Sequence, residues 1–298
     1  MKPQPQRFLD PKVLAGISTL DLVARTVVDG FVSGLHRSPD FGFSQEFAEY
    51  RPYTPGDDPR RVDWNVFART ERIYLKRYHG ETNTLLTLLL DCSASMRYST
   101  HSLSKLDYAR YLCASLAYLS NQQRDACGLV VFDEVVRDYI PASSRYGQLT
   151  KLLHSMDRAS EGTQTDFESP FVHFQQFMRR RGIVVILSDF YASPETLIKQ
   201  IEPLRQRGND VVLFHILDPQ EIDPQFKGAQ LFVDMENERK LEVSDEYLRG
   251  AYRKRVKQHL ETIQTESRRA GLDYMLLSTD KPLDAALREY LTVRQGRF

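Results

Sequence analysis

Apolar runs of five to seven residues, separated by amphipathic stretches, recur after residue 84 and limit the folds open to this chain. The most apolar of them are Leu85–Leu90, Ala126–Phe132, Ile183–Leu187 and Val211–Leu217. Between the first two, Lys105–Gln122 has the three- and four-residue apolar spacing of a helix. Strands without polar alternation are buried on both faces, and their alternation with helices is typical of parallel sheets. The pattern therefore predicts an α/β fold built on a Rossmann-like, doubly wound and mainly parallel sheet.

The same periodicities place the remaining elements and divide the chain in two. Residues 38–80 are polar and rich in turn-forming residues, unlike the rest of the chain. Ser193 and Pro194 start a helix, because a hydroxyl cap followed by proline suits a helix N-terminus. We expect residues 1–80 to form an N-terminal helix and a polar segment packed on a main domain of residues 81–298. Further strands are expected at Val135–Ile140 and Tyr274–Leu277, a hairpin insertion near residues 229–243, and helices at Pro11–Leu35, Tyr146–Asp157, Pro170–Arg180 and Asp245–Ala270.

The charge balance and the hydropathy argue against several classes of protein. Lys and Arg together number 40, as do Asp and Glu, so the net charge is zero and lacks the basic excess of a nucleic-acid-binding protein. No apolar stretch approaches the ~20 residues that span a bilayer, and the N-terminus lacks the apolar core of a signal peptide. The three cysteines have no paired metal-binding spacing. We therefore expect a cytoplasmic protein with reduced thiols, no membrane span and no nucleic-acid partner.

Oxygen-bearing side chains follow two of the apolar runs. Asp91-Cys92-Ser93-Ala94-Ser95 comes directly after Leu85–Leu90, and Ser188-Asp189 comes after Ile183–Leu187. A third polar loop, Gly162 to Asp166, leads into a predicted helix. Open α/β sheets bind their ligands at the carboxyl ends of their strands, so these loops can converge above one edge of the sheet. Carboxylate and hydroxyl oxygens suit a small, hard cation such as Mg²⁺. The sequence therefore predicts a metal-centred binding site.

The three loops resemble the metal-ion-dependent adhesion site of von Willebrand factor A domains, and the resemblance extends from about Leu85 to Leu291. In that family the hydroxyl side chains ligate the metal directly, the acids often act through water, and a carboxylate of the partner protein completes the shell. The resemblance therefore implies Mg²⁺, or Mn²⁺ or Ca²⁺ in its place, at a site for docking rather than for reaction. The metal-site residues that it implies are Asp91, Ser93, Ser95, Thr163 and Asp189, with Thr165 as an alternative to Thr163.

The polar segment narrows the resemblance further. It contains Tyr53-Thr54-Pro55-Gly56-Asp57-Asp58-Pro59 and continues through Trp64 to Arg77. This is similar to the signature of the bacterial family called domain of unknown function 58, in which it precedes a von Willebrand A-type domain. Members of this group resemble companions of MoxR-type AAA+ ATPases. The resemblance implies a non-enzymatic adaptor whose metal site docks onto the ATPase or its client. The chain itself contains no Gly-x-x-x-x-Gly-Lys-Ser/Thr loop for ATP.

The residues leave several alternatives open. Two acids near Mg²⁺ could instead activate water in a metal-dependent hydrolase or phosphatase, with His101 and Lys105 as the best supporting groups. A scaffold with a vestigial metal site is the third function considered. Cys92 could be a nucleophile, but no histidine is placed to support it, so we expect an inert thiol. The charges of residues 44–77 predict a rigid ion-pair network with Trp64 as an apolar anchor, or alternatively a partner-binding patch.

Overall fold

The computed structural model describes residues 14, 19–35, 47–53, 62, 64–70, 72–78, 84–159, 170, 174, 180–225, 230–233, 240–243 and 248–295. The chain divides into two compact units. One combines Met1–Phe31 with Thr84–Phe298, and the other is Val32–Asn83. The described residues up to Phe31 thus group with the main sheet, and the division into residues 1–80 and 81–298 stays a prediction. Among the described residues, no helix is long and apolar enough to cross a membrane.

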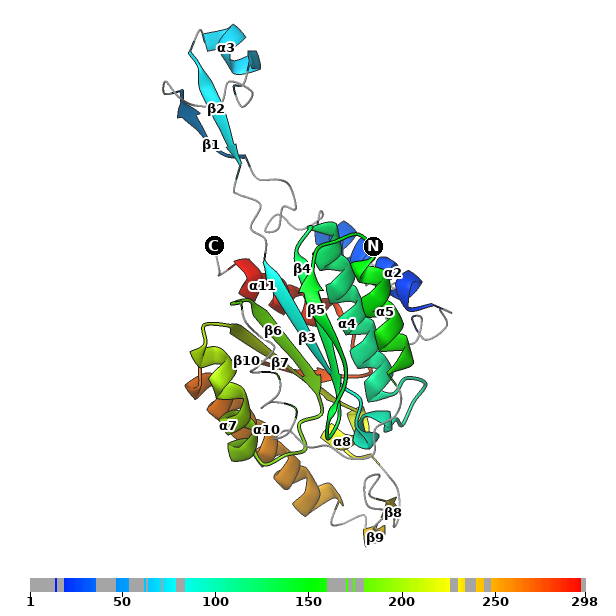
Figure 1. The fold of residues 1–298 in the computed structure, drawn as a ribbon. Helices are drawn as coiled ribbons and strands as arrows, with labels where there is room; N and C mark the ends of the chain where they lie inside the picture. The colour runs from blue at the N-terminus through cyan, green and yellow to red at the C-terminus, as the bar shows by residue number, and fades with distance from the viewer. Residues whose placement is uncertain are drawn as a thin grey trace, which may run out of the picture. The chain divides into compact units, whose positions relative to one another are not determined.

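A six-stranded sheet lies at the centre of the larger unit (Figure 1). Its order is β10-β7-β6-β3-β4-β5, in which β5 runs antiparallel to β4 and the other neighbours are parallel. The chain moves outward from β3 toward β5 and from β6 toward β10, so the direction of winding reverses between β3 and β6. The predicted doubly wound, mainly parallel sheet is therefore confirmed. Its strands are β3 (Leu85–Asp91), β4 (Ala126–Phe132), β5 (Val136–Ser143), β6 (Ile183–Ser188), β7 (Asp210–Leu217) and β10 (Asp273–Ser278).

Helices cover both faces of this sheet (Figure 1). On one face lie α4 (Lys105–Gln122) and α5 (Gln148–Arg158), and on the other lie α7 (Pro194–Gln206) and α10 (Arg253–Arg269). Beside α4 are α2 (Leu20–Leu35) and α11 (Asp284–Gln295). The Arg25 guanidinium of α2 lies 6.0 Å from the centre of the Tyr118 ring of α4. Arg288 of α11 lies 5.7 Å from the centre of the Phe31 ring of α2, so the N-terminal helix is part of this layer.

Most elements of the larger unit follow the apolar periodicity. Helix α4 and strand β4 have the predicted bounds, and the predicted hairpin is present as β8 (Gln230–Val233) and β9 (Lys240–Val243), which pair antiparallel. In the described part of the helix expected from residue 245, a π-helical turn, η4 (Leu248–Tyr252), precedes α10. The short elements η3 (Ala94–Arg97) and α8 (Pro219–Ile222) were not predicted. Most of the helix expected at residues 170–180 lies outside the described residues.

The smaller unit holds a two-stranded antiparallel sheet and a short helix. Strand β1 (Phe47–Pro52) pairs with β2 (Tyr74–Tyr78), and α3 (Trp64–Thr70) lies between them in the sequence. Trp64 is 60% exposed and meets Phe67 edge-on within α3. The anchoring of this segment on the main domain through Trp64 stays a prediction. The charged residues of the predicted ion-pair network lie mostly outside the residues whose side chains are described.

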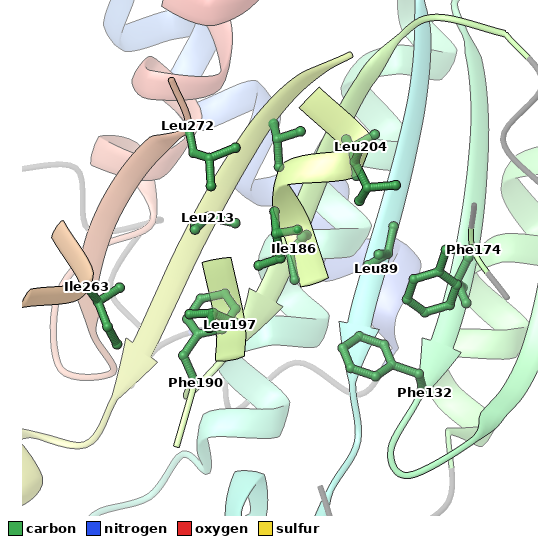
Figure 2. Packing of buried hydrophobic residues seen from close by; sticks show 14 residues of the cluster. Leu89, Phe132, Phe174, Ile186, Phe190, Leu197, Leu204, Leu213, Ile263 and Leu272 are labelled. Atoms are coloured by element: carbon green, nitrogen blue, oxygen red, sulfur yellow. The ribbon is translucent and has the colours of Figure 1, made fainter. Parts of the chain in front are cut away.

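The core beneath α7 and α10 is a continuous cluster of buried hydrophobic side chains (Figure 2). Leu89, Ile186 and Leu213 come from neighbouring strands and point to this face, because successive strand residues alternate between the two faces. Leu204 reaches the cluster from α7, and Phe190 enters it directly after the end of β6. Burying one such side chain stabilises the fold by about 1.5–3 kcal/mol. This packed core thus fixes the positions of the strands whose ends carry the polar loops.

Gly182, the residue before β6, provides a test of how closely the chain approaches β3 at this point. A Cβ atom at this position would lie 2.3 Å from the carbonyl oxygen of Leu85. We expect Gly182→Ala to lower the free energy of unfolding by roughly 1–3 kcal/mol, because the backbone must shift. Urea denaturation measures this loss. Gly250→Ala is the control, because nothing lies within 4 Å of its Cβ position. Equal stability of the two variants would contradict the prediction.

Candidate metal centre

Carboxylates gather at the point where the winding of the sheet reverses. Asp91 is the last residue of β3, and Asp189 follows the last residue of β6. These two strands are parallel neighbours, so their carboxyl ends lie at the same edge of the sheet. Doubly wound sheets bind their ligands at this switch point, because the loops diverge there and leave room between them. The fold therefore brings two of the predicted site residues into one place.

Asp91 is fully buried, and both of its oxygens accept hydrogen bonds. The backbone N–H of Ser93 donates to Oδ1 at 2.9 Å, and the Ser188 hydroxyl donates to Oδ2 at 2.5 Å. Ser188 therefore links the end of β6 to the end of β3. Burial and the charge of Asp189 raise the pKa of Asp91 to about 7, although the donors Ser188 and Ser93 act in the opposite direction. The two donors therefore do not fully offset the burial of Asp91 and its repulsion by Asp189.

The two predicted serine ligands lie together beside Asp91. Ser93 is buried, Ser95 is partly buried, and their hydroxyl oxygens are 3.2 Å apart. Ser93 precedes the 3₁₀ turn η3, but its side chain does not cap that turn. Helix capping would explain the serine of the motif without any ligand. The Ser93 hydroxyl does not play that role. The two serines of the motif thus lie side by side at the end of β3.

Asp189 is held by an unusual backbone turn. The next residue, Phe190, is fully buried and has a positive φ of 46°, a conformation that side-chain-bearing residues seldom adopt. The N–H of Phe190 donates to the Ser188 hydroxyl at 3.1 Å, which fixes the turn between them. Asp189 Oδ1 is buried and has no hydrogen-bond partner among the described residues. Such an unsatisfied oxygen is rare in protein interiors and points to a ligand or to water.

Lys105, the first residue of α4, supplies a positive charge to the same region. Its Nζ is fully buried and lies 2.8 Å from Asp189 Oδ2 and 2.8 Å from Glu221 Oε1. Burial alone would lower the pKa of Lys105, but Asp189 and Glu221 outweigh it and raise the pKa above its usual 10.5. The side chain is therefore a buried ammonium. The sequence indicated Lys105 only as a possible hydrolase group, and its contacts with these acids were not foreseen.

A third strand end adds two more acids that the sequence motifs did not indicate. Asp218 follows β7 and caps the short helix α8, while Glu221 Oε2 accepts the N–H of Asp218 at 2.8 Å. Asp218 is fully buried and accepts the Thr100 N–H at 2.9 Å and the Thr100 hydroxyl at 2.5 Å. His101 Nδ1 lies 3.3 Å from Asp218 Oδ2. A sequence signal existed, because Asp218-Pro219 follows an apolar strand and Glu221 completes a capping box.

These residues meet the chemical requirements of a hard divalent cation. The donors near Asp91 are carboxylate and hydroxyl oxygens, which suit Mg²⁺. One buried oxygen of Asp189 has no partner among the described residues, and Asp91 and Asp189 repel each other. The described residues contain no group of three or more His, Cys, Asp or Glu side chains arranged for a metal. Serine hydroxyls would therefore have to complete the set, as the motif predicts.

The other predicted site residues are accounted for as follows. Thr163 and Thr165 lie outside the described residues, so the third loop stays a prediction. Cys92 is fully buried, and burial, with Asp133 and Asp91, raises the pKa of its thiol to about 12. A thiol with that pKa stays protonated near neutral pH and is a poor nucleophile. All three cysteines are free and buried, as expected.

His215 of β7, which pairs with Ser188 of β6, provides a pH test of this region. Its Nδ1 lies 2.9 Å from the Tyr274 hydroxyl, and burial, together with His259, lowers its pKa to about 3 from 6.5. The unfolded chain therefore binds one more proton between these values, so stability present above pH 6.5 is lost as the pH falls. We expect a slope of up to about 1.4 kcal/mol per pH unit in the free energy of unfolding.

Denaturant titrations between about pH 4 and 7 measure that slope, and His215→Gln should reduce it. Tyr274→Phe is the control, because it removes the hydroxyl partner but leaves the imidazole buried. An unchanged slope in His215→Gln would show that other groups dominate the acid sensitivity.

Comparisons with known proteins found related sequences in two mycobacteria. Rv1480 of Mycobacterium tuberculosis and Mb1516 of Mycobacterium bovis, both named uncharacterized proteins, are each 28% identical over 292 residues, which cover 96% of this chain and 91% of theirs.

Among solved structures, BatB of Bacteroides thetaiotaomicron matches with 15% identity and a TM-score of 0.48, over 71% of this chain and 99% of BatB. The SpRpn10 VWA domain matches with 12% identity and a TM-score of 0.41, over 69% and 94%. We assign the fold from the strand order of the chain's own sheet. The family model described as "Protein of unknown function DUF58" matches residues 49–262, more than half of the chain. The chain therefore belongs to the DUF58 family.

Proposed function

We propose that this protein is a non-enzymatic, divalent-metal-dependent protein-interaction module. The observation that carries the proposal is the buried Oδ1 of Asp189, unpartnered among the described residues, beside Asp91 and the paired hydroxyls of Ser93 and Ser95. These oxygens lie at the switch point of the sheet, where such folds bind ligands. Asp91, Ser93, Ser95 and Asp189 would hold the cation, with Thr163 or Thr165 from the third loop.

The donor set favours docking over reaction. Serine hydroxyls are neutral, so they do not neutralise a divalent cation, and the cation then attracts a further carboxylate. Asp91 accepts hydrogen bonds from Ser93 and Ser188, which fix the orientation of its carboxylate. When bound, the cation would supply an open coordination position for an acidic side chain of a partner protein. The chain's own residues then act by holding that position rigid.

The partner that we propose is a MoxR-type AAA+ ATPase or its client. The support is the resemblance of residues 44–77 to the family signature and the match of the family model to residues 49–262. In this view the ATPase hydrolyses ATP and remodels an assembly, and this chain recognises the partner through its metal site. An acidic side chain on the partner would be the contact that depends on the metal.

Removing the metal tests the proposal directly. After chelator treatment and dialysis, titration calorimetry with Mg²⁺ and Mn²⁺ should show binding to about one site per chain, with the cation held by oxygen ligands. A purified MoxR-type ATPase from the same organism should then co-elute with the chain in Mg²⁺ and separate in chelator. Absence of heat and of a thermal shift with either cation would favour the scaffold with a vestigial site.

A metal-dependent hydrolase is the second candidate, and one observation favours it. Lys105 and His101, the two groups considered as supporting residues, both lie beside acids of the site. Against this, Lys105 Nζ is fully buried and already bonded to Asp189 and Glu221, so it is not available to a phosphate group. Turnover of a generic phosphoester in Mn²⁺ that is lost in Asp91→Asn would support the hydrolase.

A further inference from the structure

The ammonium of Lys105 is built into the acid cluster. Nζ donates to Asp189 Oδ2 and Glu221 Oε1, both at 2.8 Å, and the lysine side chain is fully buried. The rings of Tyr191 and Tyr98 lie 4.7 Å and 5.8 Å from Nζ, at distances typical of cation–π contacts. The Tyr191 hydroxyl also donates to Glu221 Oε1 at 2.7 Å. This lysine is therefore held in place from several sides.

The two acids that contact Lys105, Asp189 and Glu221, lie near two further buried acids. Asp91, Asp189 and Asp218 are fully buried, and the side chain of Glu221 is 12% exposed. Among the described residues, the positive charges that contact these acids are Lys105, and His101 when it is protonated. These acids therefore carry more negative charge than the described positive groups neutralise, which favours the binding of a further cation. A divalent cation and the ammonium would share Asp189, whose Oδ2 is bonded to Lys105 and whose Oδ1 is unpartnered among the described residues.

We infer that Lys105 is a tethered competitor of the divalent cation: by pairing with Asp189 it keeps the metal affinity of the site low. This inference rests on the metal site proposed above. Two positive charges that draw on one buried carboxylate repel each other, and protein interiors screen that repulsion weakly. The ammonium is attached to α4 and cannot diffuse away, so it acts on every metal-binding event. A cation would be held tightly only when the Lys105–Asp189 pair is loosened.

A positioning role for Lys105 would change the metal affinity in the opposite direction. If Lys105 positions Asp189 for the metal, its removal would weaken metal binding. A purely structural role would leave metal binding unchanged. Metal affinity therefore separates the three roles, whereas stability alone does not, because removing one partner of a buried ion pair destabilises a protein in every case.

The test is titration calorimetry with Mn²⁺ on the full chain and on the double variant Lys105→Met with Glu221→Gln. This pair of changes removes one positive and one negative charge, so the net charge of the cluster is unchanged. The introduced glutamine can place its amide oxygen to accept the Asp218 N–H and its amide NH₂ to donate to the Tyr191 hydroxyl oxygen, which protects the fold. We expect the double variant to bind Mn²⁺ at least about tenfold more tightly than the wild type.

Two further variants complete the experiment. Lys105→Arg keeps the charge and should not gain affinity. Without metal, Lys105→Met alone should melt at a lower temperature than the wild type. Mn²⁺ should raise the melting temperature of this variant more than that of the wild type, because the cation replaces the missing charge. If Lys105→Met does not fold, the double variant still decides the question.

The outcomes separate this inference from the metal-site proposal. If the wild type binds Mn²⁺ and the double variant binds it equally or more weakly, the competitor role is overturned and the metal site stands. If neither chain binds Mn²⁺, both proposals fall. Tighter binding by Lys105→Arg as well would also count against competition, since the charge is still present.

Discussion

Replacing Asp91 with asparagine is expected to abolish metal-dependent capture of a partner while leaving the chain folded. The buried carboxylate would lose its charge but keep its shape, and the amide oxygen can still accept a bond from the Ser188 hydroxyl. We expect the affinity for Mn²⁺ to fall by about 10- to 100-fold, the usual effect of removing a group that orients a metal site. Titration calorimetry measures the affinity, and co-elution with the ATPase in Mg²⁺ measures the capture. Ser93→Ala should have the same effect on capture.

The chain offers a matched control for this substitution. Asp133 follows β4 at the same edge of the sheet and is also fully buried, but Arg137 Nη2 lies 2.7 Å from its Oδ2. Asp133→Asn should therefore reduce stability without changing metal binding or capture. Capture by Asp91→Asn at the wild-type level, in a folded protein, would end the docking proposal. Loss of capture in both variants would indicate a structural effect rather than a metal site.

Phe190→Ala is expected to have the largest effect on stability and to weaken the site as well. Phe190 is fully buried in the cluster beneath α7 and α10, which also contains Leu197 (Figure 2). Truncating a buried phenylalanine typically lowers the free energy of unfolding by about 3–5 kcal/mol. The same side chain anchors the turn that presents Asp189, so its loss should also reduce the affinity for Mn²⁺. Urea denaturation and calorimetry measure the two effects separately.

Leu204→Ala is the control for this second effect. Leu204 belongs to the same cluster but lies on α7, and its truncation is expected to cost about 2–5 kcal/mol. At a temperature where both variants are folded, Leu204→Ala should keep the wild-type affinity for Mn²⁺ and Phe190→Ala should not. Equal metal affinity in the two variants would show that the Phe190 turn does not position Asp189.

The local pattern was sufficient for the elements that form the sheet. The apolar runs are long enough to be buried on both faces, so Ala126–Phe132 and Lys105–Gln122 have the predicted bounds. The hydroxyls of Ser93 and Ser95, two residues apart in the Asp-x-Ser-x-Ser motif, lie 3.2 Å apart. Glu221 shows the limit of this reasoning, because no apolar pattern indicated that it reaches Lys105.

The sequence by itself determined the α/β class, the parallel strands and the acids at the ends of β3 and β6, because strand burial and hydroxyl spacing are local properties. Only the tertiary structure decided that Lys105 pairs with Asp189 and Glu221, which lie 84 and 116 residues away in the chain. Those contacts depend on the order β7-β6-β3, which brings three strand ends to one edge of the sheet. Periodicity shows which residues are buried but not which strands are neighbours, so the balance of charge at the site follows from the fold alone.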